Sequence, residues 1–85
     1  MASIDDLVAS IDGDVAAGNG LAGQVEASRA MAEQLTGVLM GLAVEGVAAQ
    51  VDLCRRELEA ALGLQRALVA KLEEARAAAE LARTI

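Results

Sequence analysis

The sequence predicts an all-α fold, a two-helix antiparallel hairpin that turns near residues 41–46. Apolar residues recur at helical spacing along both halves of the chain. Alanine, the best helix former, is the most frequent residue, and proline is absent. Three glycines (Gly37, Gly41 and Gly46) lie at mid-chain, where a reversal gives two arms of similar length. The 85 residues are predicted to form a single helical domain, 1–85.

The first arm is predicted to begin at Ser3. Ser3 is a suitable N-cap, and Asp6 stands three residues later in the position of a capping box. Asp5 and Asp6 also suit the positive end of the helix dipole. An apolar stripe then follows at helical spacing: Ile4, Leu7, Val8, Ile11 and Val15.

Glycines weaken the middle of this arm, and the segment Gly18–Gly20 is the favoured place for a kink or break. Two alternatives to the hairpin therefore stay open. A break there gives three helices, and no reversal at all gives one continuous helix in a long coiled coil. Beyond the segment the apolar stripe resumes with Leu21, Val25, Ala32, Leu35, Leu39 and Leu42.

The second arm runs from Val47 to the C-terminus and contains one glycine, Gly63. A heptad pattern fits it, with Val51, Leu58, Gln65, Leu72 and Ala79 at one position and Cys54, Ala61, Leu68, Ala75 and Ala82 at the other. The predicted helix-interface residues are Val51, Cys54, Leu58, Leu68 and Leu72 in the second arm and Leu35, Leu39 and Leu42 in the first, with Gly41 and Gly46 at the turn.

The net charge of −6 is unevenly distributed, because residues 1–50 hold seven acids and a single base, Arg29. In an antiparallel hairpin the N-terminal acids come near Arg76 and Arg83, which favours that arrangement. No basic patch and no aromatic ring is present in the sequence, so we expect no nucleic-acid binding.

The motifs that resemble functional sites lack their required context. Gly18–Gly23 reads G-x-G-x-x-G, but a helical stripe precedes it where a dinucleotide site needs a strand. Histidine is absent, and no serine has an activating partner, so we expect no enzyme activity, no cofactor and no metal site. Cys54 is expected to be a buried thiol, with an intermolecular disulfide as the alternative.

The longest uncharged stretch, residues 34–44, is too short to span a bilayer. The first residues are acidic and lack the apolar segment of a signal peptide. We therefore expect a cytoplasmic protein, or one exported without a cleavable signal peptide.

The layout resembles the WXG family, the small helical hairpins that are substrates of type VII secretion. Val44-Glu45-Gly46 occupies the place of the family's central Trp-x-Gly turn, with Val44 where the family has tryptophan. The family's Tyr-x-x-x-Asp/Glu secretion signal has one match in spacing, from Arg76 to Glu80, without the tyrosine. The resemblance implies four-helix dimers and export, and the Ala-, Arg- and Glu-rich composition is similar to that of small actinobacterial helical proteins.

A two-helix hairpin of this length buries one seam, and such small folds usually need a partner. We therefore predict a non-enzymatic interaction module that dimerises, or pairs with a related helical protein, in a four-helix bundle. The alternative is a self-assembling coiled-coil subunit of a larger oligomer or filament.

Overall fold

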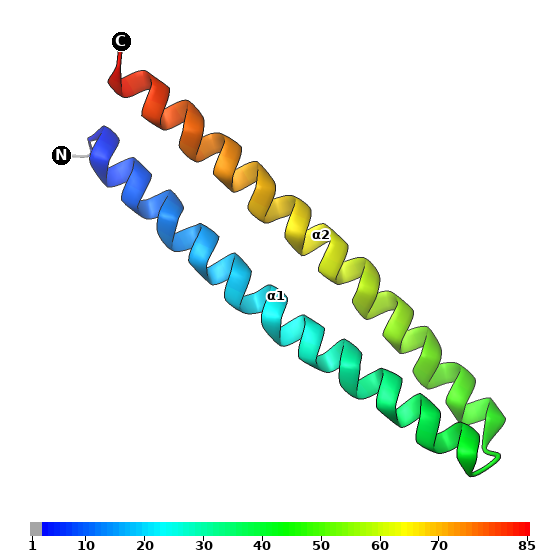
Figure 1. Cartoon of the computed structure of the whole chain (residues 1–85). Helices are drawn as coiled ribbons and strands as arrows, with labels where there is room; N and C mark the ends of the chain where they lie inside the picture. Colours follow the sequence, from blue (N-terminus) through cyan, green and yellow to red (C-terminus); the bar gives the residue numbers. More distant parts are fainter. Residues whose placement is uncertain (1–2) are drawn as a thin grey trace.

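Two long helices make up the protein in a computed structural model, which describes residues 3–85. Helix α1 spans Ile4–Gly41 and helix α2 spans Glu45–Arg83. They run side by side in opposite directions along their whole length, so the termini share one end and the turn lies at the other (Figure 1). The hairpin measures 64 Å by 15 Å by 15 Å. The predicted all-α hairpin is confirmed.

A capping box starts α1. The Ser3 hydroxyl accepts a hydrogen bond from the backbone N–H of Asp6 at 3.2 Å, and the Asp6 carboxylate accepts one from the backbone N–H of Ser3 at 3.1 Å. Together they satisfy two of the N–H groups that a helix start leaves free. From here α1 continues without interruption through Gly18–Gly20, so the three-helix alternative does not occur.

The reversal is built by Leu42, Ala43 and Val44. Ala43 adopts a left-handed conformation with φ 58°. The backbone N–H of Ala43 donates to the Met40 carbonyl, and that of Val44 donates to the Leu39 carbonyl, each at 3.1 Å. These two bonds define a Schellman motif, which closes the C-terminus of α1.

Glycine usually occupies the left-handed position of this motif, and here alanine does. The two glycines predicted as turn residues flank the reversal instead: Gly41 is the last residue of α1 and Gly46 the second of α2. No glycine among residues 3–85 has a positive φ. The residue that turns the chain is therefore Ala43.

The helices meet along a seam whose residues recur at alternating steps of three and four, as in a two-stranded coiled coil. Gly18 of α1 lies against Val69 of α2, where the two helices approach closely. The core is thin, since none of the described large side chains is fully buried. The buried residues are Val8, Gly18 and Ala32 in α1 and Ala48, Leu62, Val69 and Ala79 in α2.

Neither helix, within the residues described, has a stretch that is long and apolar enough to cross a membrane.

Candidate functional site

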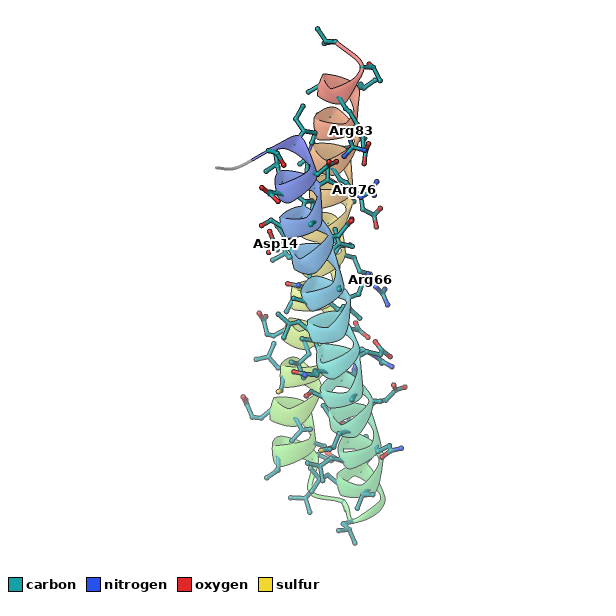
Figure 2. The ribbon with its side chains drawn as sticks, turned by 90° about the vertical axis from the view of Figure 1, so that its left-hand side faces the viewer. Asp14, Arg66, Arg76 and Arg83 are labelled. Atoms are coloured by element: carbon teal, nitrogen blue, oxygen red, sulfur yellow. The ribbon has the colours of Figure 1, made fainter. Side chains whose placement is uncertain are left out.

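The seam divides the surface of the hairpin into two long sides of different chemistry. Figure 2 shows Asp14 on the side opposite to Arg66, Arg76 and Arg83. We call the side of the three arginines the charged flank. The row of positions beside the seam on this flank holds Asp5, Asp12, Asn19, Glu26 and Glu33 in α1 and Asp52, Glu59, Arg66, Glu73 and Glu80 in α2.

We call the opposite side the apolar flank. On each helix it contains two rows of residues on the Asp14 side: the row directly beside the seam and the next row outward. Its large apolar members are Leu7, Leu21, Met31, Leu35 and Val38 in α1, Leu42 directly after α1, and Val47, Leu64 and Leu68 in α2.

Ion pairs join the two helices along the charged flank. Arg76 binds Asp12 and Arg83 binds Asp5 near the termini. Arg29 approaches Glu59 at 3.7 Å nearer the turn. The expectation that the N-terminal acids come near Arg76 and Arg83 is confirmed, and these pairs favour the antiparallel arrangement.

Arginines of this flank also stand at seam positions, among them Arg29 in α1 and Arg55 in α2. Their side chains are only 21% and 23% exposed. Their aliphatic stems cover the seam while the guanidinium groups reach outward to acids. Arg29 pairs with Glu26 and Glu33, each at 2.8 Å.

These hydrogen bonds change the acidity of their partners. The hydrogen bond from Arg29 lowers the pKa of Glu26. Hydrogen bonds from Arg55 and then Arg56 lower the pKa of Asp52. The same contacts raise the pKa of Arg29 and of Arg55. Glu26 and Asp52 are thus held ionised by arginines of the same helix, as expected of a structural ion-pair network.

The apolar flank has no such network, and its large side chains are exposed. Leu68 is 51% exposed and Met31 is 69% exposed. The charged residues on this side are Asp14, Glu57 and Lys71. A surface of this kind is typical of sites that contact other proteins.

A groove of about 330 Å³ runs along this flank near the turn, and its walls are almost entirely apolar. Cys54 is part of the wall and is exposed, so the expectation of a buried thiol is wrong. The residues that line the groove are Ser28, Met31, Ala32, Leu35, Val51, Cys54 and Leu58. The groove therefore offers an apolar depression in which a side chain of another helix can pack.

A second groove, of about 430 Å³, lies beside the turn on the other side of the molecule. Its walls include Glu45, Asp52 and Arg56, and the last two already form an ion pair at 2.9 Å. Although this groove is larger, Thr36, Asp52 and Arg56 in its wall have partners within the chain, and we place the candidate site on the apolar flank.

The predicted interface residues fall into two groups in the structure. Val51, Leu58, Leu72 and Leu39 are half-buried along the seam. Cys54, Leu68, Leu35 and Leu42 are exposed and lie on the apolar flank, so their assignment to the seam between the two helices is corrected. The second seam position of α2 is taken instead by Ala48, Arg55, Leu62, Val69 and Arg76.

The physical reason is that charged residues occupy part of the seam. A pattern that excludes Arg29, Arg55 and Arg76 moves the predicted stripe one position toward the apolar flank. The sequence does contain a signal for this placement. Each of these arginines has an acid three or four residues away on the same helix, with which it can form an ion pair.

Other motifs have structural roles. The G-x-G-x-x-G segment Gly18–Gly23 is helical throughout and follows no strand in the described part of the chain. Among residues 3–85, no cluster of three or more His, Cys, Asp or Glu side chains is placed to hold a metal ion.

Comparison of the chain with protein-family models, with curated proteins and with solved structures finds no match.

Proposed function

We propose that this protein is a non-enzymatic helix-association module, which acts by packing its apolar flank against the helices of a second hairpin. The observation that carries the proposal is the contrast between the two flanks. Ion pairs within the chain engage most of the charged groups on one side, whereas a row of large apolar side chains on the other side is left in water. Single exposed apolar residues are ordinary, but a continuous row is typical of an interface.

The thin core supports the same proposal. Six apolar residues are buried in the described chain, and three of them are larger than alanine: Val8 in α1 and Leu62 and Val69 in α2. Small single-layer folds usually obtain stability from association. Packing a partner on the apolar flank would bury the exposed leucines and so add the missing apolar contact.

The resemblance to WXG-family hairpins supports, within the same proposal, a role as a type VII-like substrate or partner. In that role the protein pairs with a copy of itself or with a related hairpin before export. The proposal for export depends on the layout of the two arms and the central turn.

A second candidate function is self-assembly into a larger oligomer or filament. The observation that favours it is a further set of exposed leucines on the back of α2, away from both flanks. Leu53 is 48% exposed and Leu81 is 66% exposed. Contacts on a second side would extend an assembly beyond a closed pair.

The test is the solution mass of the purified chain by light scattering across a hundred-fold range of concentration, together with its melting temperature. Association through the apolar flank predicts a mass above that of one chain and a melting temperature that rises with concentration. The double variant Leu35→Glu/Leu68→Glu should lose the association, while Leu53→Glu/Leu81→Glu should keep it. A monomer with concentration-independent melting would contradict the proposed function.

A further inference from the structure

We propose that the partner on the apolar flank is a second copy of this chain, packed flank to flank with the two turn ends together. This inference rests on the proposed function and names its partner and its orientation. Three features carry it: the dimensions of the flank, the position of its charges and the distribution of its large side chains.

The dimensions of the flank match a second hairpin. A face 64 Å long and 15 Å wide offers roughly 1,000 Å², compared with about 800 Å² per partner in a stable interface. A lone helix, about 10–12 Å across with its side chains, would cover one of the two helices and leave the other exposed. A second copy covers both helices over their whole length.

The charges permit a copy of the same chain to approach. The chain carries a net charge of −6, so two copies repel unless the contact surface is nearly neutral. On the apolar flank Asp14 and Glu57 are offset in part by Lys71, and the remaining acids lie on the charged flank or the outer surfaces. In a flank-to-flank pair the two charged flanks face outward on opposite sides of a four-helix bundle, separated by more than a screening length of about 8–10 Å.

The large side chains fix the orientation. Those of the apolar flank concentrate in the half nearer the turn, which holds Met31, Leu35, Val38, Leu42 and Val47, whereas the half nearer the termini holds Leu7, Leu21 and Leu68. Toward the termini α2 presents Ala75, Ala78 and Ala82 on this side.

Joining the turn ends places the two apolar halves in contact with each other. It also brings each groove level with Met31 of the other copy, and methionine is a flexible side chain that fills irregular gaps. The opposite orientation would set the leucines of one copy against the alanines of the other, together with Asp14 and Lys71, and would bury less apolar surface.

Spin-label distances test the orientation. The native thiol is removed by Cys54→Ser, and a label is attached through Glu45→Cys at the start of α2. If the turn ends meet, the two labels of a pair lie within about 30 Å, since they are separated by one or two helix diameters. If the hairpins run oppositely, the labels lie nearly one molecular length apart, about 60 Å for a helix of this size. A label through Ala67→Cys, near the middle of α2, is the control, because it gives a short distance in both orientations.

A matched pair of substitutions tests the surface. Leu68 and Leu53 belong to the same helix and are 51% and 48% exposed, but only Leu68 lies on the apolar flank. Leu68→Glu should weaken the pair by at least ~100-fold, because it buries an unpartnered charge. Leu53→Glu should change it by less than ~3-fold, within the usual range for surface positions. Circular dichroism should show equal helicity in both variants, since neither residue is buried within the hairpin.

The outcomes separate this inference from the proposed function. A two-chain mass with a short Glu45→Cys distance supports it. A two-chain mass with a distance near 60 Å overturns the turn-to-turn arrangement and leaves the proposed function standing. A larger assembly overturns the closed pair, and equal loss of association in the Leu68→Glu and Leu53→Glu variants overturns the choice of surface. A monomer at every concentration overturns the inference and the proposed function together.

Discussion

Gly18 lies so close to Val69 that a Cβ atom at residue 18 would stand 2.7 Å from the Val69 Cγ2 atom. The side chain of Gln65 donates a hydrogen bond from Nε2 to the Gly18 carbonyl oxygen at 3.3 Å, one helical turn from that contact. The other seven glycines have no atom within 4 Å of such a Cβ. Gly18 is thus the one glycine of the chain at which the missing side chain lets the helices approach.

Two glycine substitutions should therefore differ in effect. Gly20→Ala adds a methyl group in open space and should stabilise the protein by up to ~1 kcal/mol through helix propensity. Gly18→Ala gains the same propensity but must displace a stiff β-branched side chain, an overpacking that costs about 1–3 kcal/mol. Urea denaturation should show Gly18→Ala to be less stable than Gly20→Ala, and the deficit should shrink when Val69→Ala is present in both. Equal stability of the two single variants would mean that the helices are not in close contact at residue 18.

The left-handed Ala43 should be improved by glycine. An L-residue in this conformation costs about 1–2 kcal/mol, whereas glycine adopts it readily at some entropic cost in the unfolded chain. Ala43→Gly is therefore expected to raise stability by ~1 kcal/mol. The control is Ala60→Gly, at an exposed position inside α2, which should lower stability by about 0.5–1 kcal/mol. A loss of stability in Ala43→Gly would argue against the Schellman turn.

Leu62 is the most buried leucine, at 5% exposure, and stands on the seam. Leu62→Ala should cost about 2–5 kcal/mol, the usual effect of emptying a buried site. Leu53→Ala, on the back of the same helix, should cost less than ~0.5 kcal/mol. Thermal melting at one concentration compares them. Leu68→Ala, measured in a dissociated chain, is the further comparison. If it lowered stability as much as Leu62→Ala does, Leu68 would lie on the seam, as the heptad pattern of the sequence predicted.

Asp52 should make stability depend on pH. Its pKa in the folded chain is lowered from the ordinary 3.8 by the hydrogen bonds from Arg55 and Arg56. The stabilisation is therefore fully present above about pH 3.8 and is lost as the pH falls through the lower folded value. The melting temperature of wild type should exceed that of Asp52→Asn at pH 7, and the difference should shrink as the pH falls below 3.8. Added salt at pH 7 should reduce it, because the pair is accessible to solvent. A difference that grew on acidification would contradict this account.

The local features of the fold were predictable from the sequence. Ser3 and Asp6 act through bonds within one turn, so residue types at fixed spacing identify them. The abundance of alanine and the lack of proline predict long helices, and the glycines near mid-chain place the reversal to within a few residues. The turn residue itself was not predictable, because Ala43 carries none of the usual preference for a left-handed conformation.

The choice between seam and flank was harder for a geometrical reason. Residues on the seam recur at alternating spacings of three and four along the chain. A set of residues shifted by one position from the seam shows the same spacings. Leu58 and Leu68 both fit such a stripe, yet Leu58 is half-buried and Leu68 is exposed. The two stripes are distinguished by pairing across the helices, as between Arg76 and Asp12, and that information is not local to either helix.

Both chain ends leave the hairpin at the end remote from the turn (Figure 1). A support or a fused domain attached to either terminus would therefore lie at the same end of the hairpin. The turn would point away from it in both cases. A bulky fusion at either end would stand beside the alanine-rich part of α2 and leave the groove near Cys54 accessible. In a pair packed flank to flank with the two turn ends together, all four chain ends lie at the other end of the bundle. Two fused domains would then be held as neighbours.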